Sequence, residues 1–407
     1  MQWKSCSKTL MILAALLGLA AYGAAATETV LYNFQGGNDG NRPYGVIMVN
    51  GRLYGTAAQG GASNLGTVFE LVHTKSGWIE NTLHSFTGEA DGGNPRALLT
   101  ADKAGNLYGA ANAQNRLGSP VVFEMSRDAK GKWHFKIIHM LGQGEGFNPN
   151  GLVVDDAGNL YGTAANGGGS GCAHNVGCGT VFELSPVGDG RWKFTMLHRF
   201  DGKDGAAPLA PLYRDARGSL YGTTEVGGSG CAPNGCGTVF ELSPSGGGWK
   251  FAVLHRFSGG SDGCIPLGAL IMGQGGALYG ATPDCGAGMG LVYRLSLRDG
   301  RWQESVLYRL GSPPDAALPA AGVLFGSDGT MYGTGQEGGT FYQGAIFELK
   351  RSGDSWTESV PFSFNGSDGA YPMSMVSGGD GKYYGTTPDG GNGQCSGGCG
   401  VVFEFVP

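Results

Sequence analysis

The sequence predicts an all-β fold, a seven-bladed β-propeller, and three observations lead to this prediction. A tyrosine–glycine pair recurs every 52 to 60 residues, at Tyr54, Tyr108, Tyr161, Tyr221, Tyr279, Tyr332 and Tyr384. Each interval holds four short segments rich in Val, Phe, Tyr and Thr, which is typical of β-strands. Gly and Asp-Gly clusters separate these segments, in a chain with 79 glycines, and supply the tight turns of hairpins. Seven four-stranded units at such a period indicate a propeller.

The fourth unit illustrates the expected strand order, from strand A at the ring axis to strand D at the rim. Residues 208–215 should form strand A, 220–224 strand B, 237–243 strand C and 249–257 strand D. The glycine inside "LYGT" of strand B would weaken an isolated strand. We therefore expect it to allow a close approach between layers of the blade.

The two ends of the chain supply an independent check on the ring. The segment "TVLYNF" reads as a strand D that no strands A to C precede, and the final "GVVFEFVP" reads as a strand C that no strand D follows. Together the two fragments make one complete blade. Pairing of the N-terminal strand with the C-terminal blade would close the ring and remove its open edges.

Residues 1–26 read as a secretory signal peptide. Lys4 and Lys8 precede the apolar run "MILAALLGLAAYG", and the small residues Ala24 to Ala26 offer a cleavage site. The run is too short to span a bilayer well, so we expect no membrane span after cleavage. The sequence thus predicts a secreted or periplasmic protein with one propeller domain over residues 27–407.

Eight cysteines remain once Cys6 leaves with the signal peptide. An even number in an exported chain predicts disulfides, and the spacing suggests Cys172–Cys178, Cys231–Cys236, Cys264–Cys285 and Cys395–Cys399. Short spacings also suit zinc, although no second couple or histidine pair accompanies them. The pair Cys264–Cys285 follows from the architecture, because the D–A and B–C loops of a propeller blade share one face.

Charge and motifs exclude several classes of function. The formal net charge is −6, and −8 without Lys4 and Lys8, with no run of Lys or Arg. This argues against nucleic acid or an anionic membrane as partner. No nucleophile motif, phosphate loop or dinucleotide fingerprint is present. We expect a monomer without a cofactor, with calcium as the one metal to consider.

The strings "LYGTT..GG....GTVFEL" and "W....LH.F.G.DG..P" resemble the GloVer tandem repeat of exported bacterial proteins, over essentially the whole mature chain. The resemblance implies a repeat fold and export, and it implies no activity. Many relatives carry a C-terminal sorting or anchoring segment. Here Pro407 follows directly on the last strand, so a free secreted or periplasmic protein is expected.

Two sets of polar residues recur in equivalent positions, and we interpret both as structural. One position holds His84, His139, His198 and His255, but Tyr32, Tyr308 and Phe362 in other copies. A position that accepts Tyr and Phe serves packing or hydrogen bonding. The second set follows the Phe of "VFE" and comprises Glu70, Glu124, Glu183, Glu241, Glu348 and Glu404. We expect these glutamates to pair with neighbouring strands or to face solvent.

The acids of the "DG..P" motif allow two interpretations. They are Asp39, Asp91, Glu145, Asp204, Asp262 and Asp368, with Asp315 in approximately the same place. Asp before Gly commonly caps its own turn. Alternatively, the acids form a ring near the channel mouth that attracts a cation such as Ca²⁺.

A ligand site in a symmetric ring is expected where the repeat breaks, on the D–A and B–C loop face. The candidates are Arg42, Arg96, Asn112, Gln114, Arg116, Asp284, Glu337, Phe341, Tyr342 and Asp389. Aromatic, amide and charged groups suit a glycan or protein ligand, and ordinary loop drift would also explain them. The first hypothesis is a binding module. The alternative is a carbohydrate-active enzyme, a glycoside hydrolase or polysaccharide lyase. A hydrolase would need two carboxylates, such as Asp284 and Glu337, at roughly 5 to 9.5 Å.

Overall fold

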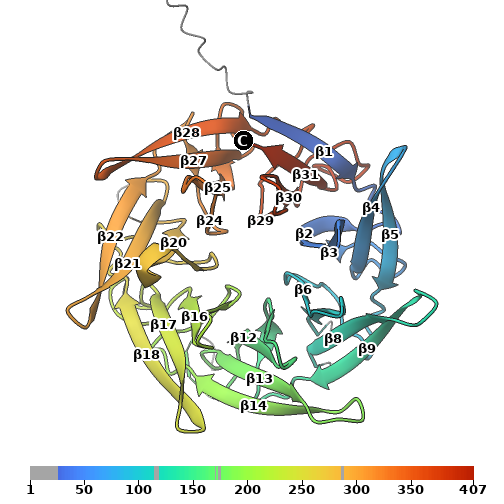
Figure 1. The fold of residues 1–407 in the computed structure, drawn as a ribbon, viewed down its shortest axis with the longest axis horizontal. Coiled ribbons are helices and arrows are strands. Elements are labelled where there is room, and N and C mark those ends of the chain that lie inside the picture. The colour runs from blue at the N-terminus through green and yellow to red at the C-terminus, as the bar shows by residue number, and fades with distance from the viewer. Residues whose placement is uncertain (1–25, 114–118, 170, 173–175, 286–287) are drawn as a thin grey trace, which may run out of the picture.

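The computed structural model describes residues 26–113, 119–169, 171–172, 176–285 and 288–407, which form a closed ring of seven β-sheets (Figure 1). Each sheet is antiparallel, and strands follow one another from the axis to the rim in sequence order, except that the outermost strand of the seventh blade is the first strand of the chain. The predicted seven-bladed propeller is confirmed. The predicted signal peptide lies almost wholly outside the described residues, as do Gln114 and Arg116.

The strands of the first four blades run from the axis outward in this order. The first blade has β2 (Asn41–Val49), β3 (Arg52–Gln59), β4 (Thr67–Thr74) and β5 (Gly77–Ser85). The second has β6 (Thr100–Ala101), β7 (Leu107–Ala111), β8 (Val121–Arg127) and β9 (Trp133–Met140). The third has β10 (Phe147–Pro149), β11 (Val153–Val154), β12 (Leu160–Asn166), β13 (Thr180–Pro186) and β14 (Trp192–Arg199). The fourth has β15 (Tyr213–Arg214), β16 (Leu220–Thr224), β17 (Thr238–Ser245) and β18 (Gly248–Arg256).

The remaining three blades complete the ring. The fifth has β19 (Ile271–Met272), β20 (Leu278–Thr282), β21 (Leu291–Arg298) and β22 (Arg301–Arg309), with a short 3₁₀ turn at Gln274–Gly276. The sixth has β24 (Val323–Phe325), β25 (Met331–Gly335), β27 (Ala345–Ser352) and β28 (Ser355–Ser363), plus the small pair β23 (Ala316–Ala317) and β26 (Glu337–Gly338). The seventh has β29 (Met375–Ser377), β30 (Tyr383–Thr387), β31 (Val401–Val406) and β1 (Thr27–Asn33).

The innermost strand is shorter than the sequence suggested. Residues 208–215 were expected to be strand A, but only Tyr213 and Arg214 pair with β16. Pro208 and Pro211 have no N–H group to donate to the sheet, and Ala207 has a φ of 55°. The prediction of a long strand A was therefore wrong, whereas β16, β17 and β18 match their predicted ranges within two residues.

Ring closure follows the predicted scheme. The first strand, β1, pairs antiparallel with the last, β31, from Thr27 opposite Val406 to Asn33 opposite Val401. Figure 1 shows β1 as the outer strand of the blade that holds the C-terminus. The two ends of the chain thus share one sheet, and that blade has no missing strand.

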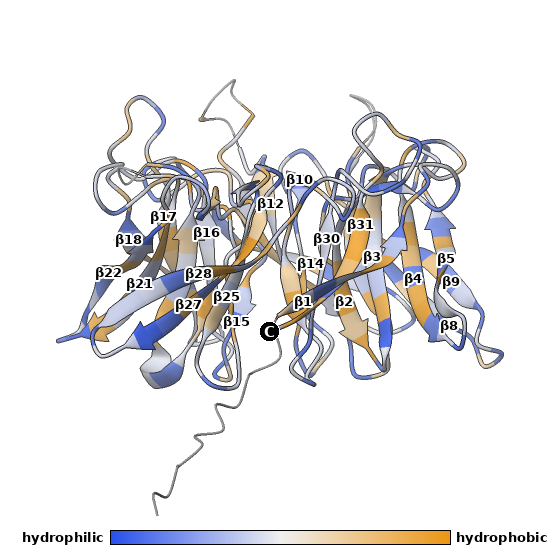
Figure 2. Ribbon diagram, turned by 90° about the horizontal axis from the view of Figure 1, so that it is seen from above, coloured by the Kyte–Doolittle hydropathy of each residue, from blue (hydrophilic) through white to orange (hydrophobic). Residues whose placement is uncertain are grey.

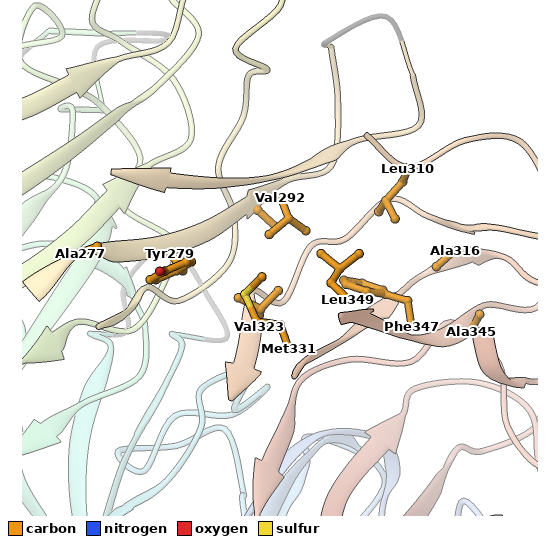
Figure 3. Packing of buried hydrophobic residues seen from close by; sticks show 11 residues of the cluster. Ala277, Tyr279, Val292, Leu310, Ala316, Val323, Met331, Ala345, Phe347 and Leu349 are labelled. Carbon is orange, nitrogen blue, oxygen red and sulfur yellow. The ribbon is translucent and has the colours of Figure 1, made fainter. Parts of the chain in front are cut away.

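The hydrophobic core lies between blades and not within them. Figure 3 shows one cluster, in which Tyr279 and Val292 of the fifth blade pack against Val323 and Phe347 of the sixth. Every hydrophobic cluster among the described residues joins two neighbouring blades in this way. A blade therefore buries its faces only against its neighbours.

All four predicted disulfides are present: Cys172–Cys178, Cys231–Cys236, Cys264–Cys285 and Cys395–Cys399. The pair Cys264–Cys285 joins the loop that enters the fifth blade to the B–C loop of that blade, as the architecture predicted. No helix within the described ranges is long and apolar enough to cross a membrane.

The repeated Tyr-Gly glycine makes room for side chains. In the third blade, Gly162 lies opposite Phe182 on the neighbouring strand. A Cβ atom at Gly162 would lie 2.7 Å from the Phe182 ring and 2.6 Å from Leu152. The close approach that we expected is therefore made by an aromatic ring and a leucine over the glycine backbone.

Replacing this glycine should destabilise the ring by overpacking. We expect Gly162→Ala to lower the free energy of unfolding by about 1–3 kcal/mol, measured by urea denaturation. The matched control is Gly144→Ala, because a Cβ at Gly144 meets no atom within 4 Å. Equal stability of the two variants would show that the glycine is not required for packing.

Candidate functional site

The D–A and B–C loops of each blade lie side by side on one face, which we call the loop face. Figure 2 shows long loops on this side of the ring and short turns on the other. Isolated bridges connect the two loops of a blade at Gly93–Asn112, Ala206–Val226, Cys264–Asp284 and Ala370–Asp389. The places where the repeat breaks therefore share one surface.

A cavity of about 340 Å³ lies on the ring axis, because residues of all seven blades line it. The wall includes, from every blade, the residue that follows the proline of the "DG..P" motif. This repeat proline is Pro43, Pro95, Pro149, Pro208, Pro266, Pro319 and Pro372 in the seven blades. We call the residues that follow it the axial ring: Tyr44, Arg96, Asn150, Leu209, Leu267, Ala320 and Met373.

The backbone before the repeat proline explains why the axial ring lines the channel. In all seven blades the residue that precedes this proline has a φ between 47° and 59°, in the left-handed region. These residues are Arg42, Asn94, Asn148, Ala207, Ile265, Leu318 and Tyr371. Such a φ is rare for residues other than glycine, and the proline then fixes its own φ near −65°. Together they turn the chain from the loop face into the channel wall.

The mouth of the channel is a second cavity of about 310 Å³. Its polar and aromatic lining comprises Arg42, Tyr44, Arg96, Gln336, Tyr371 and Asp389. Arg42 Nη2 lies 3.1 Å from Asp389 Oδ2, so these two charges offset each other. Arg96 is exposed and forms no ion pair with any residue that the structure describes. Burial raises the pKa of Tyr44 against the opposing effect of Arg96, so its phenol keeps a proton to donate.

The axial ring has two unlike halves. The first three blades contribute the polar groups Tyr44, Arg96 and Asn150, whereas blades four to seven contribute Leu209, Leu267, Ala320 and Met373. The position before the repeat proline shows nearly the same difference between the first three blades and the other four. It is Arg or Asn in the first three blades and Ala, Ile, Leu or Tyr in the others. The axial ring is therefore polar on the side of the first three blades and apolar on the side of the other four.

The candidate residues fall into two groups. Arg42, Arg96 and Asp389 come together at the mouth. The rest of those described lie around the mouth. Asn112 donates to the Asn94 carbonyl and Asp284 accepts from the Cys285 amide. Glu337 is exposed in β26, and Phe341 and Tyr342 are 54% and 66% exposed.

Sequence reasoning missed most of the channel wall. Tyr44, Asn150, Leu209, Leu267 and Met373 were not singled out, although each occupies the position after the repeat proline. Comparing the seven copies at that position would have found them, because it changes from Arg to Leu while the proline beside it stays.

The "DG..P" acids contact strand D at the rim and do not line either axial cavity. Asp91 lies 3.1 Å from His84 Nε2, and Asp204 lies 2.8 Å from His198 Nε2. Both acids also accept loop amides, from Thr87 and Asp201. The recurring histidines are thus hydrogen-bonding and packing groups, as predicted.

The strand-C glutamates also behave as predicted. Glu70 accepts from Arg52, Tyr54 and Arg127, at 2.7, 2.8 and 2.6 Å. Arg127 belongs to the next blade, so Glu70 joins two blades.

At each junction between two blades, one further position on strand D lies close to a "DG..P" acid and its partner. We call the glutamates at this position the junction glutamates. Phe135, Phe194 and Phe251 occupy one repeat position on strand D, and their rings stack on His84, His139 and His198 with centroids 3.8, 5.0 and 3.6 Å apart. The other four blades have glutamate there: Glu28, Glu80, Glu304 and Glu358. Burial, and then the charges of Asp368, Asp39, Asp262 and Asp315 respectively, raise the pKa of Glu28 to about 8 and of the other three to about 7.

Within the described part of the chain, one group of three candidate metal ligands gathers, namely Cys231, Cys264 and Cys285. All three are oxidised in disulfides, so they offer no thiolate to a metal. Calcium binding by the rim acids stays a prediction.

Comparisons with known proteins agree with this architecture. A family model described as the Gloeobacter/Verrucomicrobia repeat matches residues 20–229, 80–289 and 286–407. A search of curated proteins found no match.

Among solved structures, a fungal alcohol oxidase of the AA5 family in complex with copper is 12% identical, with 94% of this chain and 76% of that chain covered and a TM-score of 0.56. A protein from Lactobacillus plantarum is 13% identical, with 90% and 100% covered and a TM-score of 0.55. A PQQ-bound aldose sugar dehydrogenase from Streptomyces coelicolor is 14% identical, with 94% and 99% covered and a TM-score of 0.45. At these identities the alcohol oxidase and the Lactobacillus plantarum protein show a likeness of fold alone.

The junction glutamates should make the protein less stable as the pH rises toward about 8. The folded state holds their protons more tightly than the unfolded chain, whose glutamates titrate near 4.5. This stabilisation is complete below pH 4.5 and is lost as the pH rises through about 7 to 8. His84 and His255 have lowered pKa values because of burial, and they act in the opposite sense below about pH 6.5. We therefore expect the melting temperature to fall between pH 6.5 and 8.5, measured by circular dichroism. A constant or rising melting temperature over this range would contradict the account.

Replacing one glutamate by the aromatic residue of the other junctions should reverse this effect locally. Glu304 interacts electrostatically with Asp262, Arg309 and Tyr293. It occupies the repeat position whose phenylalanine, in other blades, stacks on the histidine of the preceding blade, which is here His255. We expect Glu304→Phe to stack on His255 and to add about 1 kcal/mol at pH 8, with a smaller loss of stability between pH 4.5 and about 7. Glu304→Gln is the control, since it removes the charge without the ring. Stability equal to that of Glu304→Gln would argue against stacking.

Proposed function

This chain belongs to the Gloeobacter/Verrucomicrobia repeat family, and from that premise we propose that it is a binding module outside the cytoplasm whose ligand docks at the channel mouth. One observation carries the proposal, namely the difference between the halves of the axial ring. The strand-B glycine, which the packing between strands requires, repeats in all seven copies. The axial ring instead varies, and it lines a cavity of a size typical of ligand sites.

The surrounding loops support contact with a larger ligand. Phe341, Tyr342 and Tyr371 are exposed aromatic residues of the loop face, and such residues suit the glycan or protein ligand expected from the sequence. Four disulfides are typical of proteins in oxidising compartments, which supports export.

Binding is favoured over glycoside hydrolysis. Hydrolysis of this kind uses two carboxyl groups beside the scissile bond. Among the described residues that line the two cavities, the one carboxylate is Asp389, and Arg42 holds it. Neither Asp284 nor Glu337 lines them.

A thermal-shift screen with a blocked variant tests the proposal. The panel holds polysaccharide fragments, peptidoglycan fragments, peptides, alkyl amphiphiles, Ca²⁺ and a chelator. A ligand present at 100 times its dissociation constant should add about 2.7 kcal/mol to the wild type. It should add nothing to Ala320→Trp, whose new side chain fills the axial ring.

The matched control is Ala157→Trp, on an exposed turn of the opposite face. It should respond like the wild type. A ligand that stabilises all three proteins equally would place binding elsewhere and contradict the proposal.

A further inference from the structure

We infer that the ligand of this channel is a small anionic amphiphile, a carboxylate on a hydrocarbon chain, with its head at Arg96 and its chain along the apolar half of the channel. The inference rests on the proposed binding function and names the chemical class that the site selects.

The charge of the site favours an anionic head group. Arg42, Arg96 and Asp389 are the charged residues among the described lining of the two cavities, and the ion pair of Arg42 with Asp389 leaves one positive charge. Arg96 therefore attracts an anion within a protein of formal charge −6. A guanidinium binds a carboxylate with two parallel hydrogen bonds, and the Tyr44 phenol lies in the same cavity as a further donor.

The wall below the mouth favours an apolar chain. Beyond Leu209, Leu267 and Met373, the wall is mainly apolar. Its apolar residues are Leu98, Pro211, Ala269, Ile271, Leu324 and Val376, and its polar side chains are those of Tyr213, Tyr332, Thr334, Gln336 and Ser374. A backbone bridge joins Ala269 to Gly322 of the next blade, so this part of the wall is continuous. Burying hydrocarbon against such a wall is favourable by about 25 cal/mol per Å².

The same wall disfavours the other ligand classes. A sugar chain inside the channel would lose hydration at many hydroxyl groups, and two of the polar side chains there are already engaged, because Asn150 donates to the Pro208 carbonyl and Thr334 to the Met373 carbonyl. A cationic amphiphile would bring like charge to Arg96. A divalent cation needs several oxygen ligands, and Asp389 is already paired.

Arg96 lines both cavities, whereas Arg42 lines only the mouth. This placement sets the orientation, with the carboxylate at the mouth and the chain toward the interior. The volume of about 340 Å³ suits a chain of medium length.

Calorimetry with three ten-carbon probes tests the inference, below their micelle-forming concentrations and at pH 7. The probes are decanoate, decyltrimethylammonium and decyl maltoside, which share the chain and differ in head group. Decanoate should bind at least about tenfold more tightly than the other two. Its affinity should rise roughly fourfold per methylene from hexanoate to decanoate.

Four variants locate the site. Arg96→Gln should weaken decanoate by about tenfold or more and leave the weak binding of decyl maltoside unchanged. Arg191→Gln is the matched control, because Arg191 is 74% exposed on a turn of the opposite face, and it should bind like the wild type. Ala320→Trp should abolish decanoate binding. Leu209→Asp should also abolish decanoate binding, because its carboxylate repels that of the ligand. It replaces Ala320→Trp in the test if the tryptophan variant does not fold.

Three outcomes would overturn the inference. Equal affinity for the three probes would show that the site does not select a carboxylate head group. Decanoate binding that is unchanged in Arg96→Gln, Ala320→Trp and Leu209→Asp would show that decanoate does not bind in the channel. If no alkyl probe bound, an amphiphile would not be the ligand. The proposed function would still stand if Ala320→Trp abolished the binding of another ligand of the panel. If no panel ligand were blocked either, both would fail.

Discussion

Packing between neighbouring blades is the interaction on which the whole structure depends. A blade has no core of its own, so its apolar faces stay buried only while the ring is closed, and the β1–β31 pairing closes it. Closure also brings seven chain segments together at the axis. The second residue after the repeat proline is accordingly small in every blade: Gly45, Ala97, Gly151, Ala210, Gly268, Ala321 and Ser374. A Cβ at Gly268 would lie 2.3 Å from the Gly322 backbone.

This constraint separates positions that must repeat from positions that are free to differ. The strand-B glycine is conserved among the copies because of packing, and the second residue after the repeat proline stays small because space at the axis is limited. The residue just after the proline faces the cavity, so neither constraint acts on it. Here the same repeat position is polar in the first three copies and apolar in the last four, which gives the ring its two halves. A symmetric scaffold thereby carries a site with direction, in which a charged head and an apolar chain have different places.

The sequence was sufficient for the fold, the ring closure and the disulfide pairing, because each follows from the period and from local spacing. It was not sufficient where contacts cross from one repeat to the next. The proximity of Glu304 to Asp262 depends on how neighbouring blades pack, and the two acids belong to different copies of the repeat. The short inner strand was missed because apolar residues such as Leu209 were taken as strand, whereas the prolines beside them break the ladder. Arg42, Arg96 and Asp389 were found as breaks in the repeat, but Leu209 and Leu267 resemble ordinary core residues until the axis is known.

A crystal structure of the protein with decanoate tests the central claim most directly, because it shows where the ligand lies. The account predicts density on the ring axis, with the carboxylate within hydrogen-bonding distance of the Arg96 guanidinium and the chain beside Leu209 and Leu267. Density on the outer loops, at the rim junctions or on the opposite face would contradict it. So would a reversed ligand, with its carboxylate deep in the channel.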